Sequence, residues 1–549
     1  MPLSAPALHR SISRSSGAQA HARCLLRLGP AGLIEVVSPF DAVTQAQLRA
    51  IRPRGQWRSR RGCWEFPLTA ARVLQDQLAH RFAIEPELAR WFLWLDQPLP
   101  PLPPFRQLLA AAEVDRPLQD GRSLLPHQRL AVRWLMVRRG AVLADAMGLG
   151  KTLSALVAAR TLARMTGCRV MVIAPVGLHA LWRQEAAGVP LEIELHSWAA
   201  LPEELPAAGT ILIADEAHYA QNLSSVRTQR FLRLARHPRL RAIWLLSGTP
   251  MKNGRPVQLF PLLAAIGHPL GLDQRAFEEL FCAGHWRESG GVRHWHALGA
   301  SQLGELQRLT RPLMLRRAKH HCLDLPPKHR SLVPVHLDGN QGKGFQHRLQ
   351  LAVDDYRLRA ARGEVRRDAE ALAVLTALRR IGAEYKLPAA AALVEELLAR
   401  SEAVVVFTAF VATAELLQDR LGGALLTGRL PPPERQRQVE RFQAGQQPLL
   451  TATFGAGGLG FTLHRARHVV LLERPWTPGD TEQAEDRCHR IGMEGGLTCH
   501  WLQLGVADQF VDGLIASKAE RISLVLDQRS CRLKRQPLPA MVRDLLKRW

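Results

Sequence analysis

The stretch LADAMGLGKTLSAL, residues Leu143–Leu156, decides the fold, because it joins an apolar run to a helical pattern. It nearly spells a phosphate-binding loop, whose strict form is Gly, four residues, then Gly-Lys-Ser/Thr. Gly150-Lys151-Thr152 is intact, but Asp145 stands where the first glycine is expected. Main-chain N–H groups and a helix N-terminus bind phosphate in such loops. The stretch predicts an ATP site, with a chance Gly-rich turn as the alternative.

Each residue type in this loop has a chemical reason. Gly148 and Gly150 let the backbone approach phosphate oxygens closely. Lys151 can reach the β and γ phosphates, and the Thr152 hydroxyl can bind Mg²⁺. ATP and Mg²⁺ are therefore the expected cofactors.

The apolar runs on either side of this loop predict parallel sheets. GAVLAD, RVMVIAPV, TILIADEAH and RAIWLLSGTP alternate with helical stretches between about 120 and 250. The alternation returns from about 386 with AVVVFTAF, LLTATFGAGG, HVVLLERPW and TCHWLQLG. Such alternation indicates βαβ units, whose functional residues follow the carboxyl ends of the strands. The region between the two segments looks mostly helical and without such strands.

A pair of acids follows the third run of the first segment. Asp215 and Glu216 come directly after four apolar residues. Two adjacent carboxylates at the end of a buried strand are costly unless a cation needs them. Asp215 can hold Mg²⁺ through water, and Glu216 can orient an attacking water. Together with the loop, the pair indicates an ATPase; a strand end that merely meets solvent is the alternative.

A third element comes from the second segment. In QAEDRCHRIG, Arg487 and Arg490 are three residues apart, so we expect them on one face of a helix. Two such arginines could reach a γ-phosphate across a cleft, as arginine fingers do. The alternative is a pair of solvated arginines in an Arg-rich chain.

The charge of the chain points to a polyanion. The 549 residues carry a formal net charge of +24, and only nine of the 73 basic residues are lysine. Nucleic acid is the usual partner of such an excess, although an Arg-rich composition can also come from the genome. No apolar run is long enough to span a membrane.

The eight cysteines and the first residues bear on location. The cysteines form no Cys-x-x-Cys pair, so a zinc module is not expected, and KHHC (residues 319–322) is interpreted as structural. The pattern favours a reducing compartment. The acid-free beginning resembles a transit peptide in composition, but a short disordered start is preferred. We expect a protein of the cytoplasm or nucleoid in a bacterium, or of the nucleus in a eukaryote, and not a secreted one.

At this point the stretch from about 122 to 525 resembles a Swi/Snf-type ATPase of helicase superfamily two. The matching segments, in order, are LLPHQRLAVRWL, LADAMGLGKT, VIAPVGLHALWRQE, DEAHYAQN, LLSGTPMKN, LMLRRAKHHCLDLPPK, VVVFTAF, TFGAGGLGFTL and WTPGDTEQAEDRCHRIGM. The family usually has Asp at the position of Asp145. Two departures are Ala146, where Glu is usual, and Met493, where Gln is usual.

The resemblance implies a role for each matched position. It implies ATP contacts, with Gln128 reading adenine, at Gln128, Asp145, Gly148, Leu149, Gly150, Lys151, Thr152 and Gln483. It implies coupling of the ATP cycle to DNA at His218, Ser247, Thr249, Gly457 and Gly458, and DNA contacts at Arg316, Arg317 and Lys319. The family generally translocates on duplex DNA without separating its strands.

A narrower resemblance concerns the beginning of the chain. LGASQLGEL (residues 298–306) resembles the annealing-helicase branch, and residues 38–68 resemble its HARP module, which helps to engage branched DNA. The residues themselves agree, because Arg58, Arg60 and Arg61 could bind phosphates while Trp57 and Trp64 stack unpaired bases. An ordinary small domain with buried aromatics and a basic rim remains equally possible.

The predicted fold class is α/β, with two RecA-like parallel-sheet lobes, helical insertions and a small N-terminal α+β module. The expected boundaries are a disordered N-terminus (1–32), the HARP-like module (33–95), a Pro-rich linker (96–119), lobe 1 (120–250), helical protrusions with the inter-lobe linker (251–385), lobe 2 (386–526) and a basic tail (527–549).

The predicted function is an ATP-driven motor on double-stranded or branched DNA, acting in repair or fork maintenance, with protein partners unknown. Two alternatives stay open. One is a DNA-binding scaffold with a weakened ATPase, supported by Ala146 and Met493. The other is a DEAH-type RNA helicase, disfavoured by WTPG, by RRAK and by the long helical inserts.

Overall fold

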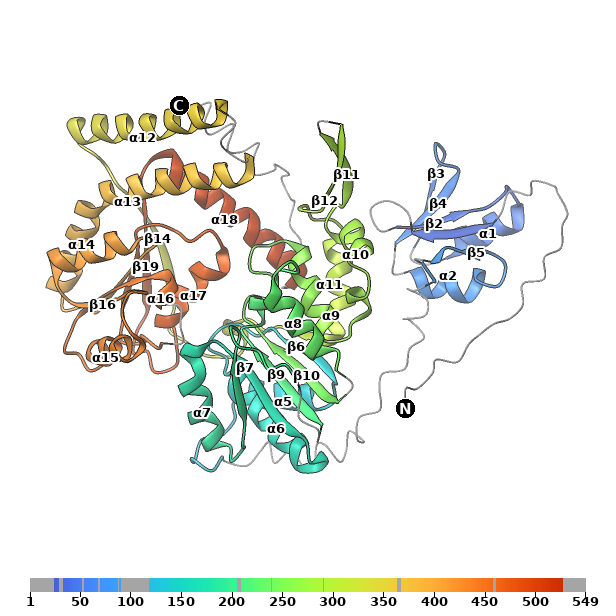
Figure 1. The fold of residues 1–549 in the computed structure, drawn as a ribbon, viewed down its shortest axis with the longest axis horizontal. Coiled ribbons are helices and arrows are strands. Elements are labelled where there is room, and N and C mark those ends of the chain that lie inside the picture. The colour runs from blue at the N-terminus through green and yellow to red at the C-terminus, as the bar shows by residue number, and fades with distance from the viewer. Residues whose placement is uncertain are drawn as a thin grey trace. The chain divides into compact units, whose positions relative to one another are not determined.

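The computed structural model describes residues 24–28, 33–51, 54–67, 70–86, 88–89, 118–204, 209–237, 239–289, 291–362, 367–457 and 461–526. The chain divides into two compact units, Met1–Pro98 and Leu99–Trp549 (Figure 1). The basic tail (527–549) and nearly all of the Pro-rich linker lie outside the described residues, so the predictions for them stay predictions.

The first unit is a small α+β module. Its sheet has the order β3-β4-β2-β1-β5. The strands are β1 (Leu25–Leu28), β2 (Leu33–Val37), β3 (Gln56–Arg58), β4 (Cys63–Pro67) and β5 (Ala83–Ile84), and the helices are α1 (Ala42–Ala50) and α2 (Ala71–Leu78). The boundary predicted at residue 33 was wrong, because the apolar strand β1 pairs with both β2 and β5.

Lobe 1 is built on a parallel sheet of order β13-β6-β10-β9-β7-β8. Its strands are β6 (Gly140–Leu143), β7 (Arg169–Ala174), β8 (Glu194–Ser197), β9 (Thr210–Asp215), β10 (Leu240–Leu246) and β13 (Met314–Leu315). Its helices are α5 (Pro126–Met136), α6 (Lys151–Thr166), α7 (His179–Gly188) and α8 (Val226–Ala235). Strands β6 and β9 are buried along their whole length, which explains their unbroken apolar runs.

The region between the lobes was predicted to be mostly helical and without strands of a parallel sheet, and the second part of that prediction was wrong. It contains α9 (Phe260–Ala265), α10 (Gln274–Phe281) and α11 (Leu303–Thr310), but also a hairpin of β11 (His285–Ser289) and β12 (Val292–His296). Strand β13 joins the lobe 1 sheet beside β6, and β14 (Lys328–Pro334) joins the lobe 2 sheet beside β19. These strands were missed because β13 is very short and β14 is mostly exposed and polar.

Lobe 2 is a second parallel sheet, of order β14-β19-β18-β15-β17-β16. The other strands are β15 (Val404–Thr408), β16 (Ala424–Leu426), β17 (Leu449–Thr453), β18 (His468–Leu471) and β19 (Leu497–Gln503). The helices are α12 (Gly339–Ala361), α13 (Arg367–Ala399), α14 (Val411–Leu421), α15 (Pro432–Gln443), α16 (Phe454–Gly457), α17 (Pro478–Cys488) and α18 (Gly505–Leu526). Two parallel-sheet lobes, an insertion and an N-terminal module confirm the predicted fold class.

Buried ion pairs tie the long helices of lobe 2 to its sheet. Lys386 of α13 is fully buried and donates to Asp508 Oδ2 of α18 at 2.9 Å. Arg474, which follows β18, pairs with Asp512 of α18 through two nitrogens. Removing one partner of such a pair leaves a buried charge uncompensated and costs about 3–5 kcal/mol. The pairs therefore fix where α13 and α18 pack.

Candidate functional site

The predicted phosphate loop lies between β6 and α6, as the sequence indicates. Gly148 and Gly150 have φ of +82° and +72°, in the left-handed region that favours glycine. A Cβ on Gly150 would lie 2.1 Å from Gln128 Nε2, so any side chain there would displace the Gln128 amide. Leu149 between them is buried, while Thr152 is half-buried in the first turn of α6.

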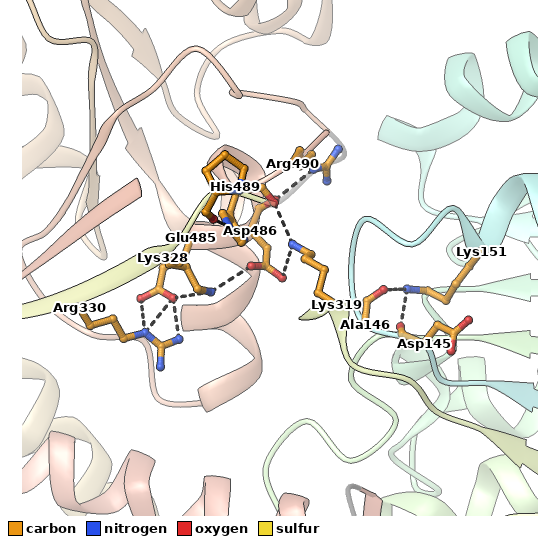
Figure 2. A network of polar contacts seen from close by, with 11 residues as sticks. Asp145, Ala146, Lys151, Lys319, Lys328, Arg330, Glu485, Asp486, His489 and Arg490 are labelled. Atoms are coloured by element: carbon orange, nitrogen blue, oxygen red, sulfur yellow. Dashed lines mark hydrogen bonds and ion pairs between the residues drawn. The ribbon is translucent and has the colours of Figure 1, made fainter. Parts of the chain in front are cut away.

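Lys151 points its ammonium back into this loop. Its Nζ donates to the carbonyl oxygens of Asp145 at 2.8 Å and of Ala146 at 3.3 Å (Figure 2). Burial lowers the pKa of Lys151, an effect that the nearby charges of Glu216 and Asp145 oppose. A buried ammonium held by main-chain carbonyls can exchange those partners for the oxygens of a bound anion.

Gln128 contacts the loop from the N-terminus of α5. Its side-chain oxygen accepts from Leu125 N at 2.9 Å, and its amide donates to Leu149 O at 3.4 Å. His127 Nε2 lies 3.0 Å from the same carbonyl oxygen. The residue expected to read adenine is therefore in place beside the loop and is already oriented by it.

Asp145 explains why an acid can replace the first glycine of the loop. It is 2% exposed, and Arg317 binds it with two nitrogens, of which Nε lies 3.0 Å from Oδ1. Arg317 also donates to His127 O at 2.6 Å, while Arg316 donates to Ala144 O at 3.0 Å and to Gly248 O at 2.9 Å. The prediction that these two arginines contact DNA is not supported, because they brace the nucleotide loop instead.

Asp215 ends β9 and Glu216 follows it, at the sheet edge where the loop also lies. Asp215 is held on both sides, because Trp182 Nε1 donates to Oδ2 at 2.9 Å and Glu216 N donates to Oδ1 at 2.8 Å. Burial and the Glu216 charge raise the pKa of Asp215. Burial alone would also raise the pKa of Glu216, but the contact with His218 and the charges of Lys151 and Arg487 outweigh it and lower that pKa.

The backbone at Glu216 is strained, with φ +49° and ψ +48°. A non-glycine residue in this region costs about 1–3 kcal/mol and is typical of functional sites. The turn places Glu216 Oε2 3.2 Å from His218 Nδ1 and stacks the His218 ring on Tyr219. His218, expected to couple the ATP cycle to DNA, thus contacts the carboxylate expected to orient water.

Ser247 and Thr249 follow β10 and reach toward lobe 2. Ser247 is buried and its hydroxyl accepts from Thr249 N at 3.2 Å. Gln221 Nε2 donates to Pro250 O at 2.7 Å, which links this turn to the segment after Glu216. A Cβ on Gly479 of lobe 2 would lie 2.6 Å from Thr249 Cγ2, so the two lobes touch here.

The two arginines of lobe 2 do not share a helical face, so that prediction was wrong. Helix α17 ends at Cys488, which leaves Arg487 in its last turn and Arg490 beyond it. Arg490 donates to Asp486 O at 3.1 Å and to Thr462 Oγ1 at 2.8 Å. Burial and the Arg490 charge lower the pKa of Arg487 to about 9, while the charges of Glu216 and Asp486 oppose this shift. The charge of Glu216 in lobe 1 therefore acts on Arg487 in lobe 2.

Lys319 joins the nucleotide loop to the arginine segment. Its Nζ lies 2.9 Å from Asp486 Oδ2 and donates to His489 O at 2.9 Å (Figure 2). Its Cε is 3.4 Å from the place of a Cβ on Gly148. Lys319 is only 11% exposed, so the prediction that it contacts DNA is not supported in this arrangement. It lies in the seam between the lobes.

A second row of ion pairs supports Asp486 from within lobe 2. Lys328 Nζ, at the start of β14, lies 3.1 Å from Asp486 Oδ1 and 3.2 Å from Glu485 Oε2. Arg330 donates to both oxygens of the fully buried Glu485 (Figure 2). The sequence reasoning missed Lys328, Glu485 and Asp486. The only signal was the acid pair next to Arg487, because the partners lie more than 150 residues away.

The remaining predicted positions are placed as follows. Gln483 is half-buried on α17, and Gly457 ends the short helix α16. Gly458 lies outside the described residues. Met493 is 8% exposed and packs in the hydrophobic core of lobe 2, so its departure from the family pattern changes a core residue.

The N-terminal module presents one of its two predicted tryptophans. Trp57, on the edge strand β3, is 46% exposed, whereas Trp64 is 8% exposed and donates its indole N–H to Gln45 Oε1 at 2.9 Å. Trp64 therefore belongs to the core, and the expectation that it stacks on bases was wrong. Arg58 pairs with Glu65 and Arg61 with Glu35 and Glu65, yet both remain nearly half exposed, and Arg60 is exposed.

The described residues contain neither a membrane-spanning helix nor a cluster of metal ligands. No helix in the described ranges is long and apolar enough to cross a bilayer. No group of three or more His, Cys, Asp or Glu side chains suited to a metal ion is found among the residues that the structure covers.

The fold and the site define a two-lobed nucleotide-binding protein, and comparison with known proteins gives the family. The SNF2-related domain matches residues 202–387, and the helicase conserved C-terminal domain matches residues 389–492. The chain belongs to the SNF2-related, Swi/Snf-type family.

The individual relatives are about 27–30% identical to this chain. A DNA annealing helicase and endonuclease ZRANB3 of Bos taurus is 30% identical over 59% of this chain and 30% of its own length. A SWI/SNF-related matrix-associated actin-dependent regulator of chromatin subfamily A-like protein 1 of Xenopus tropicalis is 27% identical over 74% of this chain and 45% of its own. A putative ATP-dependent helicase/translocase YwqA of Bacillus subtilis is 27% identical over 72% and 48%. The chain thus spans less than half the length of these relatives.

A solved Sulfolobus solfataricus SWI2/SNF2 ATPase core in complex with dsDNA aligns over 75% of this chain and 94% of its own, at 22% identity and a TM-score of 0.34. That TM-score is too low to compare how the lobes are arranged in the two structures.

Proposed function

We propose that this chain is a DNA-dependent ATPase that moves along duplex DNA, with Mg²⁺-ATP bound between the two lobes. One observation carries the proposal. Arg487 of lobe 2 lies in the segment that Lys319 holds against the lobe 1 loop, and its charge and that of Glu216 act on each other. A carboxylate that orients water and an arginine that binds developing negative charge are the two groups that phosphoryl transfer needs.

The residues present fit a nucleotide. Thr249 Oγ1 is a buried hydroxyl without a hydrogen-bond partner among the described residues, and it lies in the same turn as Gly248. A Cβ on Gly248 would lie 3.5 Å from Lys151 Nζ and 2.8 Å from Met147, so only glycine keeps this approach open. The loop N–H groups and Lys151 would hold the phosphates, and Thr152 and Asp215 would hold Mg²⁺, which neutralises charge on the phosphates.

The chain's own groups then divide the work. Trp182 and the Glu216 N–H hold the Asp215 carboxylate in a fixed direction. Glu216 would orient the attacking water, and Arg487 would stabilise charge that develops on the γ-phosphate. Arg490 and Lys319 hold the segment that carries Arg487, so we assign them to positioning. His218 and Thr249 would transmit the state of the site to lobe 2.

DNA is proposed as the activating partner. The net charge of +24 suits a polyanion, and relatives are named as annealing helicases and as a translocase. Because the N-terminal module exposes Trp57, Arg58, Arg60 and Arg61 on one hairpin, we infer that it binds branched DNA. The proposed process is the remodelling or annealing of such DNA in repair or fork maintenance.

ATP turnover of the full chain tests the proposal. It is measured without nucleic acid, with blunt duplex DNA, with forked DNA and with RNA. We expect strong stimulation by both DNAs and little by RNA. Slow turnover that DNA does not change would support the scaffold alternative, and preferential stimulation by RNA would support an RNA helicase.

The role of the N-terminal module has its own test. Trp57→Ala should lower affinity for forked DNA while leaving turnover on blunt duplex unchanged. The salt dependence of fork binding should weaken with Arg60→Ala, because fewer phosphates are neutralised. If neither variant alters fork binding, the preference for branched DNA comes from the second unit.

A further inference from the structure

The hairpin β11–β12 stands apart from both sheets of the second unit. In Figure 1 it projects beyond α10 and α11, away from the strands of lobe 1. Its two strands pair only with each other in the part of the chain that the structure describes. Their register pairs Trp286 with Trp295 and Arg287 with His294. Cross-strand partners share a face, so the two tryptophans form one face and Arg287 and His294 lie on the other.

The base of the hairpin is firmly anchored. Trp295 donates its indole N–H to Glu278 Oε2 of α10 at 2.5 Å. The guanidinium of Arg275, also on α10, lies 3.1 Å from the Trp295 ring centre and 4.6 Å from that of Trp286. A Cβ on Gly284 would lie 2.4 Å from Trp295, so the strand leaves α10 in close contact with the ring. The hairpin is thus a rigid projection.

The outer part of this projection combines aromatic and cationic groups. Trp286 is 58% exposed, although its cross-strand partner Trp295 is bonded to α10. Arg293 is exposed on the same face, paired with Glu288, the one acid on the two strands, and Arg287 and His294 are exposed on the other face. Tryptophan and arginine are enriched among the residues that carry the binding energy of interfaces. A ring with nearby cations is the combination that binds single-stranded nucleic acid, through stacking on bases and attraction of phosphates.

We propose that the β11–β12 hairpin binds single-stranded DNA, with an unpaired base stacked on the exposed face of Trp286 and a flanking phosphate near Arg293. A protein partner could also bind an exposed tryptophan, but that contact would not require the excess of positive charge. The inference rests on the proposed function in that the motor must meet DNA with unpaired bases. It adds a second contact for branched DNA, separate from the N-terminal module and carried by the motor unit itself.

The test compares three DNAs of equal duplex length: a blunt duplex, a duplex with a single-stranded tail, and the same duplex with an abasic tail. The abasic tail keeps the phosphates and removes the bases. Binding is measured by fluorescence anisotropy with the full chain. Trp286→Ala should lower affinity for the tailed duplex by about tenfold and leave the blunt duplex unchanged. The wild type should bind the abasic-tailed duplex as weakly as Trp286→Ala binds the normal tailed duplex. The affinity of Trp286→Ala should be the same for both tails.

Two further variants control the result. Trp286→Phe keeps a ring and should restore most of the affinity, whereas Val292→Ala changes a residue that is 55% exposed on the same hairpin and should have no effect. Unchanged affinity of Trp286→Ala for the tailed duplex would overturn the proposal, as would an equal loss on blunt and tailed DNA. Loss of binding to a protein partner in Trp286→Ala, with its DNA affinity unchanged, would also overturn the proposal. Absent stimulation of wild-type ATP turnover by blunt duplex would instead contradict the proposed function.

Discussion

The two lobes hold their functional groups in different ways. In lobe 1, Lys151 is held by main-chain carbonyls and Asp215 by an indole N–H and a main-chain N–H, all from the same lobe. In lobe 2, the segment that carries Arg487 is held by ion pairs, and one of their cations is Lys319, which also lies against the lobe 1 loop. Lobe 1 therefore fixes its functional groups by its own contacts, while the geometry of the arginine segment of lobe 2 depends on contact with lobe 1.

This difference assigns separate tasks to the lobes. A site preorganised by short hydrogen bonds can bind nucleotide before the lobes close. Arg487 can change position when the lobes move, because a cross-lobe ion pair holds the segment that carries it and relative motion alters the geometry of that pair. Binding should therefore depend on lobe 1, and turnover should depend on how the two lobes meet.

Lys151→Ala tests the lobe 1 side and should have the largest effect. It removes the cation of the phosphate loop, so turnover should fall by about 100-fold or more. DNA affinity should stay nearly the same, because its phosphate contacts come from other residues. Turnover and DNA binding are measured beside Lys343→Ala, a change at an exposed lysine of α12. Equal turnover in Lys151→Ala and wild type would remove the ATP-site assignment.

The ion pair between Lys319 and Asp486 tests the dependence of lobe 2 on lobe 1. Lys319→Met and Asp486→Asn should each lower turnover by about tenfold through misplaced arginines, with KM for ATP changed far less. The loss in the double variant should be clearly less than the sum of the two single losses, because both single variants remove the pair between Lys319 and Asp486, although Asp486 also pairs with Lys328. Lys319→Arg should restore part of the rate.

Additive losses in this cycle would show that Lys319 and Asp486 act independently, and lobe 2 would then not rely on the pair. A parallel rise in KM for ATP would instead make Lys319 a direct nucleotide contact.

A smaller effect is expected where the lobes touch. Gly479→Ala places a methyl 2.6 Å from the present position of Thr249 Cγ2, which a rotation of that side chain can partly relieve. We expect turnover to fall by about two- to threefold with little loss of thermal stability. Gly342→Ala is the matched control, because a Cβ at this glycine of α12 meets nothing within 4 Å. Identical rates in both variants would mean that this contact does not transmit anything between the lobes.

The sequence predicted those parts of the site that lie at strand ends. Lys151, Asp215 and Ser247 each follow a buried apolar strand, and a parallel sheet must bring such ends to one edge. The order of the motifs also predicted the two sheets. These features depend on local pattern, so a single chain is enough to find them.

The sequence could not assign partners to the arginines and aromatics. Arg317 reads as a basic residue in a basic segment, but 172 residues separate it from Asp145, which it binds. Trp64 and Trp57 look equivalent in sequence, whereas strand alternation and the position of Gln45 bury only Trp64. The hairpin β11–β12 was overlooked because it is short, polar and packs on no sheet. Burial and long-range pairing decided each of these cases.

The separation of binding from turnover is tested most directly by Arg487→Ala. Equilibrium binding of Mg²⁺-ATP and DNA-stimulated turnover are measured on the same preparation, with Arg437→Ala on α15 as the control at an arginine that is 70% exposed. We predict that turnover falls by about 100-fold or more while ATP affinity changes by less than about threefold. A fall in affinity that matches the fall in turnover would make Arg487 a ligand of the ground state and would contradict the division of tasks between the lobes.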